Sequence, residues 1–187
     1  MFRVNPSNEE GHVLVGTGPR PSDADYSHPG RRHIGCLALI RNTGGEVLLV
    51  NPSYEEGHVL VGGGARPDEE AQHAAYRAAV EETGLTQLTI GDLLLVDYSP
   101  ANPKTGSVEG YHLVFDAGVV TDDAAITLPA GLPGQQPEFT SWVFCSPDQL
   151  DTYCEPSQAR RITQALAALA HPSRRGLRTE GMPVNAS

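Results

Sequence analysis

The feature that most constrains this chain is a run of three glycines at residues 62–64, followed by an acidic stretch of strong helix formers. Consecutive glycines free the backbone for positive φ values and for close approach to a ligand. Pro67 and Asp68 favour the first turn of a helix, and residues 69–82 contain no glycine or proline. Gly84 stands where a left-handed C-cap is expected. The sequence therefore predicts a glycine loop that leads into a helix over residues 69–82.

Two glutamates lie at the end of this predicted helix. At about 100° per residue, Glu81 and Glu82 project from neighbouring parts of the helix surface. Carboxylate oxygens suit Mg²⁺, which keeps several waters and bridges to phosphates, and a bound Mg²⁺ can activate water against a diphosphate. The alternative is a solvated acidic face, because runs of charge usually mean exposure to solvent. The neighbouring glycines favour the metal site.

The spacing of these residues resembles the Nudix box, G-x5-E-x7-R-E-U-x-E-E-x-G-U, in which U is aliphatic. The matching positions are Gly63, Glu69, Arg77, Glu81, Glu82, Gly84 and Leu85. Ala79 is a small residue at the first aliphatic position. The resemblance implies an α/β protein with the Nudix-type α/β/α sandwich and a mixed β-sheet. It also implies hydrolysis of the diphosphate link of a nucleoside diphosphate derivative or other organic diphosphate, with Mg²⁺ or, alternatively, Mn²⁺.

The same resemblance implies roles for individual residues. Glu82 would be a metal ligand, Glu81 a ligand or the support of one, and the carbonyl of Gly62 would face the metal. The Nudix members use the arginine of the box to brace the segment between the glycines and the helix. Here Arg77 would pair with Glu69 for that purpose, next to Gly63.

One departure from the box concerns the residue after Arg77. The family places a glutamate there, which in many members is a metal ligand or the general base, whereas this chain has Ala78. Alanine can neither hold a metal nor accept a proton. Hydrolysis with a depleted site remains open, because a general base typically contributes about 10²–10⁴-fold. The alternative is a Nudix-fold module that binds a nucleotide or diphosphate metabolite as a sensor or regulator. A third hypothesis is an enzyme that uses the Nudix fold for a different reaction.

Several residues are candidates to replace the missing glutamate. Glu138 is the first, because family members place a carboxylate in the loop before a late strand; an exposed strand-end carboxylate is the alternative. His73 lies one helical turn before Arg77 and is a weaker candidate base. His58 and His112 are candidates for lining a substrate pocket. A packing role for position 78 is also open, because it continues a stripe of small residues, Ala71, Ala74 and Ala75.

Length and charge limit the partners of this chain. Its 187 residues favour one domain with a sizeable core. The formal net charge of −10 argues against non-specific binding to nucleic acid and to anionic membrane surfaces. A diphosphate remains compatible with this charge, because a metal ion bridges acidic residues to phosphate. We therefore expect a small-molecule diphosphate as the partner, with no nucleic acid and no membrane.

The cysteines and the N-terminal residues favour a cytoplasmic location. Cys36, Cys145 and Cys154 make an odd count without a CxxC pair, which suits a reduced chain. The first six residues contain no apolar signal core. No apolar run approaches the roughly 20 residues that span a bilayer. Homodimers are common in the Nudix family, so a homodimer is an expectation for the assembly.

An internal repeat occupies the start of the chain. Residues 4–7 and 9–16 recur as residues 50–53 and 55–62, but no acidic helix follows the first copy. One interpretation is an arm without a chemical role. The other is a strand at residues 12–15 that adds to a sheet edge.

We divide the chain into three parts and expect seven strands and two further helices. The parts are an N-terminal arm with the partial duplication at 1–30, a Nudix domain at 31–172 and a polar, loose C-terminal tail at 173–187. The expected strands are 33–40, 46–50, 58–61, 88–97, 109–120, 126–128 and 138–145. A short helix is expected from residues 146–148 onward and an amphipathic helix over 156–170.

Overall fold

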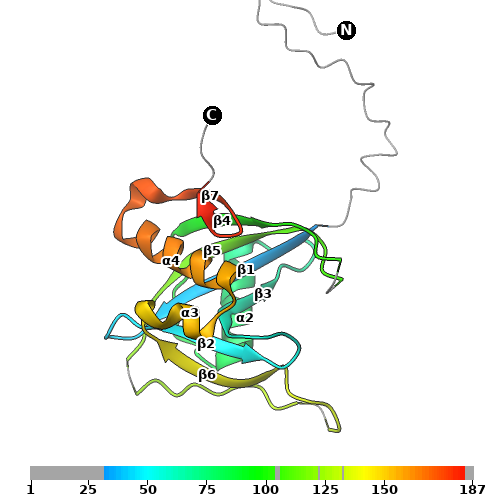
Figure 1. Cartoon of the computed structure of the whole chain (residues 1–187). Coiled ribbons are helices and arrows are strands. Elements are labelled where there is room, and N and C mark those ends of the chain that lie inside the picture. Colours follow the sequence, from blue (N-terminus) through cyan, green and yellow to red (C-terminus); the bar gives the residue numbers. More distant parts are fainter. Residues whose placement is uncertain (1–31, 104–105, 122, 132, 184–187) are drawn as a thin grey trace, which may run out of the picture. The chain divides into compact units, whose positions relative to one another are not determined.

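The structure is a computed structural model that describes residues 32–103, 106–121, 123–131 and 133–183. The strands of these residues are β1 (His33–Arg41), β2 (Val47–Pro52), β3 (Val59–Gly64), β4 (Leu93–Ser99), β5 (Gly110–Val119), β6 (Phe139–Cys145), β7 (Gly176–Thr179) and β8 (Met182–Pro183). They form one mixed sheet in the order β6-β2-β3-β1-β5-β4-β7-β8 (Figure 1). β1 is parallel to β5 and β4 is parallel to β7, whereas the other neighbours are antiparallel. The predicted mixed sheet is confirmed.

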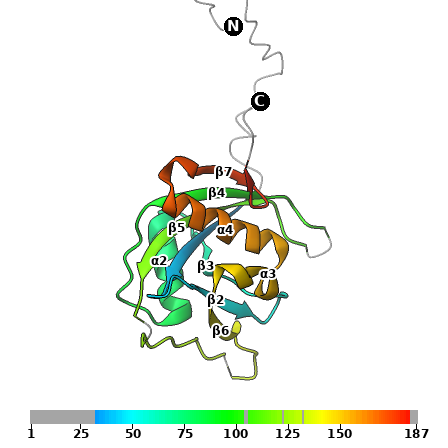
Figure 2. The ribbon, with the colours of Figure 1, turned by 60° about the vertical axis from the view of Figure 1, so that its left-hand side comes forward.

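Helices cover both faces of the sheet. They are α2 (Ala71–Thr83), α3 (Leu150–Tyr153) and α4 (Pro156–Ala170), with short 3₁₀ turns η1 (Pro147–Gln149) and η2 (Pro172–Arg174). α2 lies on one face, and α3 and α4 lie on the other (Figure 2). The predicted α/β/α sandwich is therefore confirmed. None of the described helices is long and apolar enough to cross a membrane.

The central strand β1 shows why the chain forms this sandwich. Leu37 and Leu39 pack in a cluster with Ile162 of α4, whereas Ala38, the residue between them, packs with Ala79 of α2. Alternate residues of a strand point to opposite faces, so a strand that is apolar at every position must be covered on both sides. Residues 35–40 of the strand expected at 33–40 are thus buried between two helical layers, whereas His33 and Ile34 are exposed.

The three glycines of residues 62–64 end strand β3 and do not form the loop that the sequence predicts. Gly62, Gly63 and Gly64 pair with Leu37, Cys36 and Gly35 of β1 in antiparallel register. Gly62 has φ 146°, and a Cβ atom there would lie 2.4 Å from the carbonyl oxygen of Cys36. The absence of a side chain therefore lets two strands approach closely. Pairing with β1 also satisfies backbone groups that a free loop would leave to solvent.

Helix α2 begins later than predicted and ends as predicted. Pro67 and Asp68 precede the helix, because Asp68 adopts a left-handed φ of 61° that interrupts a helical run. Glu70 occupies the N-cap position and makes no capping hydrogen bond through its side chain. At the other end Gly84 is the predicted left-handed C-cap, with φ 72° and an N–H donated to the carbonyl of Val80.

The C-terminal segment differs from the loose tail that composition suggests. β7 pairs with β4 along residues 176–179, and β8 returns against β7. Tyr98 accepts a further backbone hydrogen bond from Glu180 at 3.0 Å. Residues 176–183 therefore extend the sheet by two strands. Their polar sequence suits an edge, where side chains face solvent.

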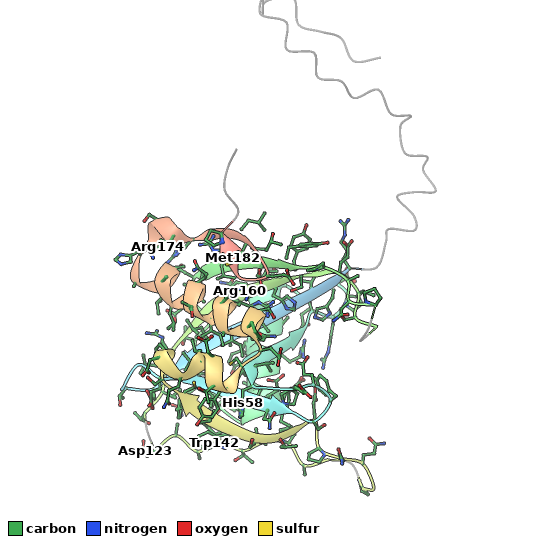
Figure 3. All side chains as sticks on the ribbon, viewed as in Figure 1. His58, Asp123, Trp142, Arg160, Arg174 and Met182 are labelled. Atoms are coloured by element: carbon green, nitrogen blue, oxygen red, sulfur yellow. The ribbon has the colours of Figure 1, made fainter. Side chains whose placement is uncertain are left out.

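Two other expectations differ from the structure. Residues 126–128 form no strand, although Ile126 and Leu128 pack against the cluster around Val61. β4 begins at Leu93 instead of residue 88. At the edges of the sheet, Trp142 lies on the outer strand β6 with 41% of its surface exposed, and Met182 lies on β8 at the other edge (Figure 3). The N-terminal arm and its repeat lie outside the described residues.

Candidate functional site

An ion pair holds the start of the acidic segment against α2. Arg77 donates from Nε to Glu69 Oε1 at 2.7 Å and from Nη2 to Glu69 Oε2 at 2.8 Å. The same Nη2 donates to the carbonyl of Gly64 at 3.0 Å, and Glu69 also accepts the backbone N–H of Arg66 at 2.8 Å. The hydrogen bond from Arg77 lowers the pKa of Glu69 to about 2. One guanidinium thus ties the helix, the segment before it and the end of β3 together.

Glu82 occupies a very different environment on the same helix. Its side chain is buried, and its Oε2 accepts the backbone N–H of Gly62 at 2.9 Å. Burial raises its pKa to about 8, with smaller contributions from the negative charges of Glu138 and Glu81, while the hydrogen bond from Gly62 acts in the opposite direction. A carboxylate with this pKa lacks a cation that would stabilise its charge.

Glu81, the expected partner of Glu82 in metal binding, points toward arginines instead. It accepts hydrogen bonds from Arg77 Nη1 at 2.9 Å and from Arg66 Nη2 at 3.2 Å. About half of its side chain is exposed, and it does not line the cavity described next. The helix places adjacent residues about 100° apart, so the buried position of Glu82 directs Glu81 toward the surface.

A cavity of about 260 Å³ brings Glu82 together with Glu138. The glycines of residues 62–64 and Tyr54 also line it. Glu138 precedes strand β6, and its carbonyl accepts the N–H of Ser53 at 2.8 Å. Burial, followed by the charges of Glu55, Glu138 and Glu82, raises the pKa of Tyr54 to about 12. This part of the cavity wall therefore groups the carboxyl groups of Glu55, Glu82 and Glu138 near one phenol.

A second group of lining residues comes from β1, β5 and α4. These residues are His33, His112, Gln158 and Arg161. Arg161 is 3% exposed and donates from Nε to the fully buried Asp97 at 2.7 Å. Burial, followed by the charges of Arg161 and His33, lowers the pKa of His112 to about 3, so this imidazole is neutral. Gly35 leaves the room for it, because a Cβ there would lie 2.6 Å from His112 Nδ1.

Sequence reasoning placed His112 at a pocket but missed Gln158 and Arg161. The available signal was weak: an arginine next to Ile162 on the inner face of the amphipathic helix α4, and an aspartate within the apolar run of β4. Either residue alone is compatible with a surface position. Only the fold shows that α4 places Arg161 over Asp97.

The donor set of the cavity fits a divalent metal ion. Among the described residues, neither Glu82 nor Glu138 forms an ion pair with a basic side chain. No group of three or more His, Cys, Asp or Glu side chains is arranged for metal binding in this part of the chain. Mg²⁺ commonly uses only one or two carboxylates and completes its shell with water and substrate phosphates. Two glutamates without a cation therefore meet its requirement.

Ala78, the departure from the Nudix box, is part of the packing of α2. It is 4% exposed, and a Cβ on Gly63 would lie 3.4 Å from the Ala78 methyl group. Ala74 and Ala75 are also fully buried on this helix. These small side chains let α2 approach the sheet closely, which agrees with the packing role considered for position 78.

The remaining candidates lie away from this cavity. His73 is exposed and lies 3.9 Å from Glu70. His58 packs edge-on against the ring of Tyr153. The three cysteines are buried and unpaired, and burial raises their pKa values, which fits inert thiols.

A larger cavity of about 430 Å³ lies near the C-terminal end of α2, lined by residues 84–88, 119–121, 124 and 125. The described residues that line it carry no ionisable side chain. Phosphate and metal recognition both depend on charged or strongly polar groups. The smaller cavity is therefore the candidate site, despite its volume.

Comparisons with known proteins agree with the box and the fold. The family model described as NUDIX domain matches residues 31–166. The MutT protein from Methanosarcina mazei Go1 is 24% identical with a TM-score of 0.61, over 77% of this chain and 99% of that one. The E. coli dihydroneopterin triphosphate pyrophosphohydrolase is 17% identical with a TM-score of 0.58, over 70% and 92%. A C. elegans Ap4A hydrolase is 17% identical with a TM-score of 0.54, over 75% and 98%. No curated protein matches significantly.

Proposed function

Because the chain belongs to the Nudix family, we propose that it hydrolyses the diphosphate link of a nucleoside diphosphate derivative or other organic diphosphate with Mg²⁺ or Mn²⁺. The observation that carries this proposal is the pair of glutamates, Glu82 and Glu138, in one cavity without a basic partner among the described residues. An acidic cavity repels a diphosphate unless a cation lies between them. The pair is thus suited to a metal–diphosphate complex.

In this proposal, four residues of the site have separate roles. Glu82 and Glu138 would hold the ion together with the backbone at Gly62. When bound, the ion supplies neutralisation of the diphosphate and a lower pKa for its bound water. Glu138 also replaces the missing glutamate as proton acceptor. Glu81 supports the site from outside, because it holds the Arg77 that braces the end of β3.

The burial of Ala78 favours a second candidate function. Packing against Gly63 occupies the place where the box supplies a third carboxylate. A chain with this change retains the fold and the acidic cavity while losing a proton acceptor. It would bind a nucleotide or diphosphate metabolite with weak or no turnover, as a sensor or regulator.

Phosphate release, coupled to pyrophosphatase or phosphatase, tests the two functions. The substrates are a panel of nucleoside diphosphate derivatives with Mg²⁺ or Mn²⁺, and the proteins are wild type, Glu82→Gln, Glu138→Gln and the control Glu70→Gln. The proposal predicts wild-type turnover that Glu82→Gln abolishes and Glu70→Gln preserves, because Glu70 is exposed and outside the cavity. A silent wild type that still binds the nucleotides would establish the second function.

We also propose a cytoplasmic location and a small-molecule partner. Cys36, Cys145 and Cys154 are all free thiols in the structure, which supports a reducing compartment. The formal net charge of −10 disfavours nucleic acid and anionic membranes. A homodimer, common among Nudix proteins, is proposed for the assembly, and sedimentation of the full chain tests it.

A further inference from the structure

The guanidinium of Arg161 is fixed inside the candidate cavity with hydrogen-bond donors to spare. It donates from Nε to Asp97, from Nη1 to Gln158 Oε1 at 2.8 Å and from Nη2 to Ser99 Oγ at 3.1 Å. A guanidinium carries five N–H donors, so two have no acceptor among the described residues. Each guanidinium nitrogen has one partner, and the unused donors on the cavity wall can bind an acceptor group of a ligand.

The same contact fixes the orientation of Gln158. Arginine has no acceptor, so the atom of Gln158 that faces Arg161 must be its oxygen. The amide nitrogen therefore points away from Arg161 and carries two further donors, which have no partner among the described residues. Gln158 and Arg161 are three residues apart on α4 and lie on the same side of the helix. Together they present two neighbouring donor groups to one ligand.

The charge of this part of the cavity is balanced. Asp97 neutralises Arg161, and Asp97 itself is held by the backbone N–H of Gly181 at 2.9 Å. The neighbouring His112 is neutral, because its pKa is lowered to about 3. A phosphate group prefers a net positive site, so a balanced pair of donors suits an uncharged acceptor instead.

The geometry points to Gln158 and Arg161 as the specificity residues that recognise a carbonyl oxygen on the nucleobase of the substrate. This inference rests on the proposed function, because it assumes that the cavity takes a nucleoside diphosphate. Bases with a ring carbonyl at the recognised edge offer acceptors to both donors. Bases with an amino group there oppose a donor with a donor. The site therefore selects 6-oxopurines over 6-aminopurines, and uracil over cytosine.

Binding of non-hydrolysable nucleotides tests the inference without requiring turnover. The probes are the α,β-methylene diphosphates of inosine, adenosine, uridine and cytidine, and methylenediphosphonate without a nucleoside. Each is titrated calorimetrically with Mg²⁺ into the full chain. We expect wild type to bind the inosine analogue about tenfold more tightly than the adenosine analogue, since a pair of hydrogen bonds that fits only one of two bases discriminates between them by about this factor or more.

Two variants remove the amide donor in different ways. Gln158→Glu keeps an acceptor for Arg161 but loses the N–H groups, and Gln158→Leu loses them without added charge. Both are expected to bring the inosine-to-adenosine ratio close to one, and the ratio cancels any general repulsion of phosphate. Gln164→Glu is the matched control, because Gln164 is a half-buried residue of the same helix that does not line the cavity. It should keep the wild-type ratio.

The remaining outcomes separate this inference from the proposed function. A base preference that is lost in both Gln158 variants supports the inference even if wild type shows no hydrolysis. Hydrolysis with an unchanged ratio in both variants supports the function and overturns the inference. If the Gln158 variants bind all probes more weakly by the same factor, methylenediphosphonate included, the amide of Gln158 contacts the phosphates instead of the base. That result would also overturn the inference. The inference would be overturned too if wild type bound none of the four nucleotide analogues.

Discussion

Glu69 and Glu82 belong to the same glycine-to-helix segment and have opposite electrostatic states. Glu69 accepts two hydrogen bonds from Arg77, and its pKa falls to about 2. Glu82 is buried against Gly62 without such a partner, and its pKa rises to about 8. A paired carboxylate serves the architecture of the segment. An unpaired one keeps its proton near neutral pH and becomes charged when a cation binds, which is how a structural glutamate differs from a functional one here.

The largest expected effect comes from Glu82→Gln. The amide can still accept the N–H of Gly62, so the fold should remain. Without the carboxylate charge the cavity loses one of its two proposed carboxylate ligands, and turnover should fall by about 10²–10³-fold or more. Phosphate release at saturating Mg²⁺ measures this, and a variant within threefold of wild type would contradict the distinction between the two glutamates.

Asp97, a buried and paired carboxylate away from the proposed metal site, can be compared with Glu69 and Glu82. Asp97→Asn removes the charge partner of Arg161, which is 3% exposed. Breaking one side of such a pair is expected to lower the free energy of unfolding by about 3–5 kcal/mol. Urea denaturation provides the value. A change below about 1 kcal/mol would mean that the pair contributes little to stability.

The brace can be weakened without removal of its charge. Arg77→Lys keeps a cation but cannot form the two parallel bonds to Glu69 or reach Gly64 in the same geometry. Supporting contacts around metal sites typically contribute about 10–100-fold to affinity or activity, so a loss in this range is expected. Titration of Mn²⁺ monitors the affinity directly. Full activity in Arg77→Lys would show that charge alone is enough.

The smallest effect concerns pH and the metal-free protein. Glutamate in an unfolded chain has a pKa of about 4.5, whereas Glu82 in the folded chain has one of about 8. Between these values the folded state binds more protons, so the contribution of Glu82 makes the free energy of unfolding decline as pH rises from about 4.5 to about 8.

Thermal unfolding in EDTA across this range, for wild type and Glu82→Gln, measures that contribution. The variant should lack this part of the decline and be more stable than wild type at pH 8 by on the order of 1–3 kcal/mol. Equal pH dependence of the two proteins would show that Glu82 titrates normally.

The sequence predicts local chemistry better than it predicts spatial partners. The C-cap at Gly84, the helix over residues 156–170 and the apolar strand β1 follow from propensity and periodicity, which are properties of neighbouring residues. The start of α2 does not, because the left-handed turn at Asp68 and the bond from Arg66 to Glu69 replace the expected first helical turn.

The site shows the same division. The family pattern identifies Glu82 and Arg77 as site residues. The direction of Glu81 depends on hydrogen bonds from both Arg66 and Arg77, and the pattern does not include Arg66. Arg161 was missed because its partner Asp97 is 64 positions away in the chain. The order of the strands in the sheet determines that contact. The sequence of β7, which extends the sheet beyond β4, is too short and too polar to be recognised as a strand.

The most direct test of the contrast between paired and unpaired glutamates is the pKa of the Glu82 carboxyl group, measured by ¹³C NMR with Glu82→Gln for assignment. In the metal-free protein we predict a value near 8, and saturating Mg²⁺ should lower it to below about 5, because a bound cation favours the charged form. A pKa near 4.5 that Mg²⁺ leaves unchanged would contradict the proposal that Glu82 is an unpaired carboxylate that binds the metal ion.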